Sequence, residues 1–130
     1  MDIVIDTSAI VAVIFGEPER KAIIKKTTGQ TLIGPGSISW EIGNAFSAMF
    51  RKGRLSLEEA LSSLEIFEQI PLRYTSTDFS HALKIAEQAK IYAYDAYFLD
   101  CAIRYNAPLL TLDKQLLGVA KTLNVATLEI

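Results

Sequence analysis

Near its start the chain carries the sequence Asp2-Ile3-Val4-Ile5-Asp6-Thr7-Ser8-Ala9, in which one type of secondary structure gives way to another. Residues 3–5 are consecutive apolar, β-branched residues, a pattern typical of a strand that is covered on both faces. Residues 6–8 have side chains that cap helices, and an apolar run at residues 9–15 follows them. This segment predicts a buried parallel strand that passes directly into a short helix.

The same alternation continues along the rest of the chain. Helices are predicted at about residues 18–28, 37–52, 56–69, 77–90 and 94–105 and after Asp113, and strands at 31–33, 71–74, 109–112 and 125–128. Alternating strands and helices joined by short turns predict an α/β fold in which helices sandwich a mainly parallel sheet. No linker, repeat or low-complexity run divides residues 1–130, so we expect one domain.

The composition is that of a soluble globular protein, with 50% hydrophobic residues, 22% charged residues and a net charge of −2. Proteins that coat duplex DNA are usually more basic, whereas a nuclease with an acidic metal site is compatible with this charge. The single cysteine, Cys101, excludes an intramolecular disulfide. The sequence shows neither a signal peptide nor the ~20 apolar residues of a membrane helix. We therefore expect a cytoplasmic protein without membrane association.

Two aspartates follow predicted strands. Asp6 comes directly after the first strand, and Asp113 comes directly after the strand at residues 109–112. In open parallel sheets, ligands bind just beyond the carboxyl ends of the strands. Both aspartates also precede helices, where a carboxylate caps the first backbone N–H groups, and for each one taken singly this is the simpler interpretation.

Three further acids lie in predicted helices. Glu41 stands beside an apolar stripe, where an unpaired carboxylate is costly unless it is paired or bound to metal. Asp95 lies among aromatic and apolar residues and is either a site residue or a cap. Asp100 is about 140° around the helix from Asp95, so we expect it to support the site or the fold rather than bind the same metal.

Clustered carboxylates repel one another, and their pKa values rise until a cation arrives. Oxygen ligands of this kind suit Mg²⁺ or Mn²⁺, whereas one histidine, His81, and one apolar-flanked cysteine argue against zinc. Such ions activate water and stabilise the charge of a phosphodiester under attack. The hydroxyls of Thr7, Ser8 and Thr111 either position ligands and water or simply cap helices.

The ordered set of these motifs resembles one known family. The set comprises Asp6-Thr7-Ser8-Ala9 after a first strand, Glu41 with Asn44 in a helix, Tyr94-Asp95-Ala96 opening a helix, and Thr111-Leu112-Asp113 after a strand. It resembles the PIN domain, and most of all the VapC-type toxins of prokaryotic toxin–antitoxin pairs. The resemblance extends from Asp2 to Val125; each piece alone is weak, but their order is specific.

The resemblance implies a three-layer α/β/α sandwich and an Mg²⁺- or Mn²⁺-dependent endoribonuclease. It further implies a homodimer and a cognate antitoxin protein as partner. Carried over by position, it makes Asp6, Glu41, Asp95 and Asp113 the catalytic, metal-binding acids, with Thr111 and Asn44 in support. Many members have Ala or Leu where this chain has Asp100, which leaves the role of Asp100 open.

Positive charge for RNA is expected at Arg51, Lys52 and Arg54, at the end of the Glu41 helix, and at Lys114 beside Asp113. For the first three, the simpler interpretation is a solvated helix end where cations meet the dipole favourably. The helices near residues 10–15 and 61–67 carry enough apolar residues to form a groove for an amphipathic partner, although core burial explains any single one of them.

Three alternatives to a toxin ribonuclease remain at this point. The first is a PIN-type nuclease of RNA processing or DNA repair. The second is a catalytically idle module that keeps the fold for binding, against which the retention of all four acids argues. The third is a phosphatase or other metal-dependent hydrolase; those usually carry a second aspartate two residues after the first, where this chain has Ser8.

Overall fold

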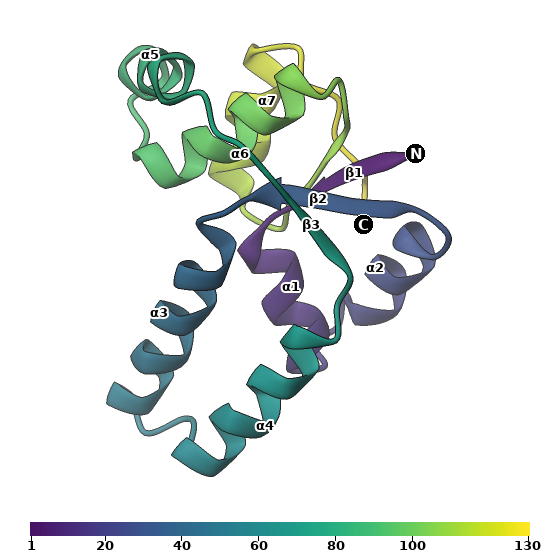
Figure 1. Ribbon diagram of the computed structural model, residues 1–130, viewed down its shortest axis with the longest axis vertical. Helices are drawn as coiled ribbons and strands as arrows, with labels where there is room; N and C mark the ends of the chain where they lie inside the picture. Colours follow the sequence, from purple (N-terminus) through teal and green to yellow (C-terminus); the bar gives the residue numbers. More distant parts are fainter.

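A parallel sheet of four strands lies at the centre of the molecule, described for residues 1–130 in a computed structural model (Figure 1). The strands are β1 (Asp2–Ile5), β2 (Thr31–Pro35), β3 (Leu72–Thr75) and β4 (Leu109–Leu110). Their order across the sheet is β3-β2-β1-β4, and every neighbouring pair is parallel. Val4 in β1 pairs with Ile33 on one side and with Leu109 on the other.

Seven helices cover the two faces of this sheet. They are α1 (Thr7–Ile14), α2 (Arg20–Thr27), α3 (Ile38–Arg51), α4 (Leu57–Glu68), α5 (Phe79–Ala89), α6 (Ala93–Arg104) and α7 (Lys114–Thr122). Helices α1 to α4 lie on one side of the sheet and α5 to α7 on the other (Figure 1). The predicted three-layer α/β/α sandwich around a parallel sheet is confirmed. None of these helices has the length and apolar character needed to cross a membrane.

Strands β1, β2 and β4 are largely buried because helices cover both faces of the sheet, whereas the edge strand β3 is partly exposed. Ile3 and Val4 in β1, Ile33 in β2 and both residues of β4 are completely buried. Together with apolar residues of the helices they form one hydrophobic core cluster. Burying an aliphatic side chain stabilises the fold by about 1.5–3 kcal/mol. This explains why residues 3–5 of β1 and both residues of β4 are continuous apolar runs rather than alternating ones.

The strand order reverses at β1. From β1 the chain moves through α1 and α2 to β2 on one side, whereas β4 arrives from α6 on the other side. In open parallel sheets, such a reversal leaves a crevice at the carboxyl ends of the two strands concerned. Asp6 directly follows β1 and Thr111 directly follows β4, so the topology brings these two residues together.

A close approach between β2 and α3 fixes the start of the helix that carries Glu41. The strand predicted at residues 31–33 extends to Pro35, which is tolerated as the last strand residue. A Cβ atom at Gly34 would overlap the end of the buried Ile38 side chain, on the first turn of α3. Glycine at this position therefore lets α3 begin directly against the sheet.

β4 is shorter than the predicted strand at residues 109–112. After Leu110 the backbone leaves the sheet, because side chains take its hydrogen bonds. The backbone N–H of Leu112 donates to the Ser8 hydroxyl at 3.0 Å, and that of Asp113 donates to the Thr111 hydroxyl at 3.0 Å. The residues that end the strand are thus residues of the candidate site.

The strand predicted at residues 125–128 is wrong. This segment runs beside β4, but it forms only one isolated bridge, between Leu109 and Thr127. Two backbone hydrogen bonds support that bridge, from Leu109 N–H to Ala126 O and from Leu128 N–H to Leu109 O. With only two residues in β4, the segment has no longer strand to pair with.

Asp100, which is completely buried in α6, holds α5 against α6. Its Oδ1 lies 2.7 Å from His81 Nδ1 and accepts a hydrogen bond from Arg104 Nε at 3.0 Å. Its Oδ2 accepts a hydrogen bond from the backbone N–H of Asp78, the N-cap residue of α5. These contacts compensate the buried charge, and they make Asp100 a structural residue.

We predict that Asp100→Ala lowers the free energy of unfolding by about 2–4 kcal/mol, because it leaves Arg104 and two donors of α5 without their partner. Asp2→Ala is the matched control: it removes an exposed pair with Arg73 and is expected to cost less than about 1 kcal/mol. Urea unfolding of both variants measures the difference. Equal losses would show that Asp100 does not join the two helices.

Candidate active site

Asp6 lies between β1 and α1 and is only 5% exposed. Its Oδ1 accepts hydrogen bonds from the Ser8 hydroxyl at 2.7 Å and from the Ala9 backbone N–H at 3.1 Å, and its Oδ2 accepts one from the Thr111 hydroxyl. Burial raises the pKa of Asp6, these hydrogen bonds lower it in part, and the charge of Asp113 raises it further. Asp6 is therefore both the cap of α1 and one of a group of acids.

Asp113 caps α7 in the same way. Its Oδ1 accepts hydrogen bonds from the backbone N–H groups of Gln115 at 2.8 Å and Leu116 at 3.1 Å. Its other carboxylate oxygen makes no hydrogen bond within the chain. Capping and ligand binding are thus compatible for Asp113, because each function needs only one of the two oxygens.

Glu41 lies in the first turn of α3 with both carboxylate oxygens in use. Oε1 accepts a hydrogen bond from the Thr7 hydroxyl of α1 at 3.1 Å, and Oε2 accepts one from the Ser37 hydroxyl at 2.8 Å. Burial raises the pKa of Glu41, and the charges of Asp6 and Asp95 raise it further against these two hydrogen bonds. Ser37 was not among the predicted site residues, although it precedes Glu41 by four residues, about one turn of helix.

Asp95 is the acid with the fewest partners. It lies in the first turn of α6, whose N-cap is Tyr92, so the interpretation of Asp95 as a helix cap is wrong. Its half-buried carboxylate makes no hydrogen bond within the chain. Burial raises the pKa of Asp95, and the charge of Asp113 raises it further. An unpaired carboxylate in this position is available to bind something that the chain itself does not supply.

These four carboxylates influence one another, although they come from distant parts of the sequence. Asp113 raises the pKa of both Asp6 and Asp95, and Asp6 and Asp95 in turn raise that of Glu41. No lysine, arginine or histidine forms an ion pair with any of them. Their negative charge therefore has no counter-charge within the chain.

In the present arrangement no three His, Cys, Asp or Glu side chains lie close enough together to hold a metal ion. Hydroxyl and backbone donors bind most of the oxygens of the four acids, and like charges repel one another where no cation is bound. The donor set itself, with carboxylate and hydroxyl oxygens alone, fits a hard divalent cation such as Mg²⁺ or Mn²⁺ and does not fit zinc.

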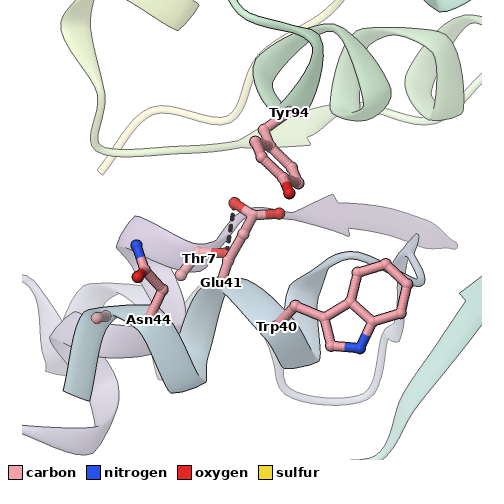
Figure 2. A pocket seen from close by; sticks show the side chains of 6 residues that line it. Thr7, Trp40, Glu41, Asn44 and Tyr94 are labelled. Carbon is pink, nitrogen blue, oxygen red and sulfur yellow. Dashed lines mark hydrogen bonds between the residues drawn. The ribbon is translucent and has the colours of Figure 1, made fainter. Parts of the chain in front are cut away.

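A cavity of about 470 Å³ opens beside Glu41, within the size range of ligand pockets (Figure 2). Asn44, predicted to support the site, lies on its wall one turn after Glu41, and Thr7 lies there too. Figure 2 shows Tyr94 of α6 on the other side of the cavity from α3. The exposed Trp40 completes the aromatic part of this wall.

The remaining predicted residues are divided between the site and other places. Ser8 and Thr111 lie in it, 3.4 Å apart through their hydroxyls, and Lys114 lines a neighbouring cavity together with Thr111. Asp100, predicted to support the site, contacts none of the four acids; its partners are His81, Arg104 and the backbone of Asp78.

The cluster of Arg51, Lys52 and Arg54 is not brought to the acids either. It lies at the far end of α3, roughly 15 Å from Glu41 at 1.5 Å per residue. Arg54 lines a different cavity, between α3 and α4. These three cations are therefore no direct part of the acidic site, and a contact with RNA there would involve nucleotides farther along a bound strand.

The structure is similar to solved structures over 89% to 99% of this chain. PAE2754 from Pyrobaculum aerophilum has a TM-score of 0.72 at 22% identity, covering 92% of this chain and 79% of that chain. VapBC2 from Rickettsia felis, bound to a DNA fragment from its promoter, has a TM-score of 0.69 at 20% identity, covering 99% and 98%. The sarcin-ricin loop cleaving toxin VapC20 from Mycobacterium tuberculosis has a TM-score of 0.63 at 13% identity, covering 89% and 93%.

At these identities the likeness shows a shared fold. A comparison with curated protein sequences finds no match. The sequence itself, however, matches the family model of the PIN domain over residues 3–122. That range includes β1 to β4 and all four acids. Since the match covers almost the whole chain, from the first strand to the last helix, this protein belongs to the PIN domain family.

Proposed function

We propose that the protein is a metal-dependent endoribonuclease, and that it is the toxin of a type II toxin–antitoxin pair. The observation that carries the proposal is the uncompensated group of Asp6, Glu41, Asp95 and Asp113, with raised pKa values at three of them. Membership of the PIN domain family supports the nuclease activity. RNA as the substrate and Mg²⁺ or Mn²⁺ as the cofactor are parts of the proposal.

Each residue of the site has its own function in this proposal. The four acids would hold the metal ion; a divalent ion bound there supplies an activated water and stabilises the charge of the phosphodiester. Thr111 and Ser8 fix the orientation of Asp6 through their hydroxyls. Asp95 and the second oxygen of Asp113 are free of hydrogen bonds within the chain, so they can turn towards a ligand without breaking any.

In this proposal Glu41 also accepts a proton. Thr7 and Ser37 hold its two oxygens, so binding a metal or a water requires only that one of two hydroxyl contacts is exchanged. Its raised pKa means that it takes up a proton more readily than an exposed glutamate, which suits a residue that accepts a proton from the attacking water. Asn44 adds an amide on the same wall of the cavity.

The proposed antitoxin partner rests on the structural neighbours and on one surface. VapC20 is named as a toxin, and VapBC2 is named as bound to a DNA fragment from its promoter. In this chain Leu57, Leu61 and Leu64 form an exposed apolar stripe on α4. A cavity of about 600 Å³, lined by Phe15 and Met49, lies against a different face of the same helix. The apolar stripe fits an amphipathic segment of a cognate antitoxin. A homodimer is the proposed assembly.

We expect the purified protein to cleave RNA with Mg²⁺ or Mn²⁺ and to be inactive with EDTA. Asp6→Asn and Asp95→Asn should each lower the cleavage rate roughly 100-fold or more, because each removes a charge that holds the metal. Asp2→Asn is the matched control, since Asp2 pairs with Arg73 at the surface and should leave the rate unchanged. Gel analysis of structured and unstructured RNAs measures cleavage.

The same experiment separates the proposal from its alternatives. Cleavage of single-stranded DNA in preference to RNA would favour a repair nuclease. Cleavage that persists in EDTA or in both site variants would overturn the metal site. If no RNA or DNA is cut, and metal leaves the melting temperature unchanged, a binding module that has kept the fold becomes the better description.

The acidic group also predicts how stability depends on pH. Because the folded-state pKa of Asp6 lies above its unfolded value near 3.8, this group contributes stability at low pH that is lost as the pH rises through the folded pKa. In EDTA, the melting temperature of Asp6→Asn relative to wild type should therefore rise from about pH 4 to about pH 7. A constant difference would contradict the shifted pKa.

Adding metal should make the wild type more stable than Asp6→Asn, the opposite of the order expected in EDTA near pH 7. At about 100 times its dissociation constant, a bound ion stabilises the wild type by about 2.7 kcal/mol, a rise of roughly 10 °C in melting temperature for a domain of this size. Asp6→Asn should show a much smaller rise, and the surface variant Asp2→Asn should show the full one. Differential scanning fluorimetry with and without Mg²⁺ or Mn²⁺ measures all three.

A further inference from the structure

Trp40, the only tryptophan of the chain, is 74% exposed beside the proposed catalytic group. It immediately precedes Glu41 on α3 and lines the same cavity (Figure 2). The indole makes no hydrogen bond and no aromatic contact within the chain. A large aromatic side chain left in water contributes little to folding, and its position at the edge of a polar cavity suits a contact with a ligand.

Tyr94 provides a second exposed ring, on the other side of this cavity. It is 53% exposed and comes from α6, one residue before Asp95. Its ring packs edge-on with Tyr97, with centroids 5.7 Å apart and planes at 85°. Tyr97 packs in turn with Phe79, at 5.6 Å and 84°. This chain of contacts fixes the Tyr94 ring before any ligand arrives, which lowers the entropic cost of binding.

Each of the two rings belongs to a residue that directly precedes one of the acids in the sequence. Trp40 precedes Glu41 and Tyr94 precedes Asp95, and both rings line the cavity beside Glu41, so a phosphodiester bound at Glu41 would have an aromatic ring on either side. The bases attached to that phosphodiester are one nucleotide away and reach the walls of the same cavity. On the other side of Glu41 from Trp40, the exposed Asn44 offers an amide that can donate to or accept from a base edge (Figure 2).

We propose that Trp40 and Tyr94 are stacking surfaces for unpaired nucleobases next to the cleaved phosphate. The inference rests on the proposed ribonuclease function. Bases inside a duplex are stacked on each other and cannot lie against a side chain, whereas unpaired bases can. Stacking on one aromatic side chain is worth between about fivefold and a hundredfold in affinity, and it tolerates any base.

The unique tryptophan makes the contact directly observable. The Asp95→Asn variant, with EDTA, binds without cutting and is titrated with a short unpaired oligoribonucleotide while the fluorescence of Trp40 is recorded. We expect quenching that saturates with the unpaired strand. The same strand annealed to its complement should cause little quenching, and this arm also corrects for light absorption by the bases.

Kinetics of the active protein provide the second readout. Trp40→Ala should raise KM for unpaired RNA roughly tenfold with kcat nearly unchanged, while Trp40→Phe should restore most of the loss because it keeps a ring. Tyr94→Ala should act in the same direction. Tyr92→Ala is the matched control: Tyr92 is 86% exposed, two residues from Tyr94 and outside the cavity, so its loss should leave KM unchanged.

The outcomes are distinguishable from one another. Quenching by the unpaired strand alone, with the KM pattern above, supports the stacking site. RNA cleavage that continues without quenching, and with an unchanged KM in Trp40→Ala, overturns the stacking site and leaves the nuclease intact. If Trp40→Ala instead shifts the protein to a smaller species in light scattering and RNA causes no quenching, the indole is a contact between copies and the stacking site is wrong. Absence of both RNA binding and cleavage overturns both proposals.

Discussion

A buried carboxylate at the end of β1 is the constraint on which the site depends. Asp6 accepts hydrogen bonds from Ser8, from the first turn of α1 and from Thr111 beyond β4, so one side chain joins two strands and a helix. The hydroxyls of Ser8 and Thr111, which donate to Asp6, also accept hydrogen bonds from the backbone after Leu110, and β4 ends there. The reversal of strand order at β1 makes this junction possible, and Glu41, Asp95 and Asp113 gather around it.

Burying a carboxylate costs free energy, and Asp100 and the four acids of the candidate site differ in whether a cationic partner compensates this cost. Asp100 is buried completely, and Arg104, His81 and a backbone N–H of α5 compensate its charge. The four acids of the candidate site have hydrogen bonds at most and no cationic partner. A protein retains such uncompensated charge at a cost in stability, and that cost is recovered when a cation binds. The contrast separates a structural acid from candidate ligands better than sequence position does.

Helix α3 connects the different parts of the proposed activity. Its first turn carries Glu41 and the exposed Trp40, and its last turn carries Arg51. Gly34 allows that first turn to lie against the sheet, which brings Glu41 within reach of Thr7 on α1. At its other end, α3 borders a cavity of about 600 Å³ together with α4. The proposed metal binding and the proposed base contacts thus both lie at the end of α3 nearest the sheet.

The sequence by itself determined the alternation of strands and helices, because apolar β-branched runs and capping residues are local signals. It also singled out Asp6 and Asp113, since an acid directly after a strand needs no knowledge of distant residues. Only the tertiary structure decided that Asp95 is not a cap, that Asp100 pairs with His81 and Arg104, and that residues 125–128 form a single bridge. These outcomes depend on which segments lie side by side. The hydrophobic periodicity of a segment does not indicate which distant segment it contacts.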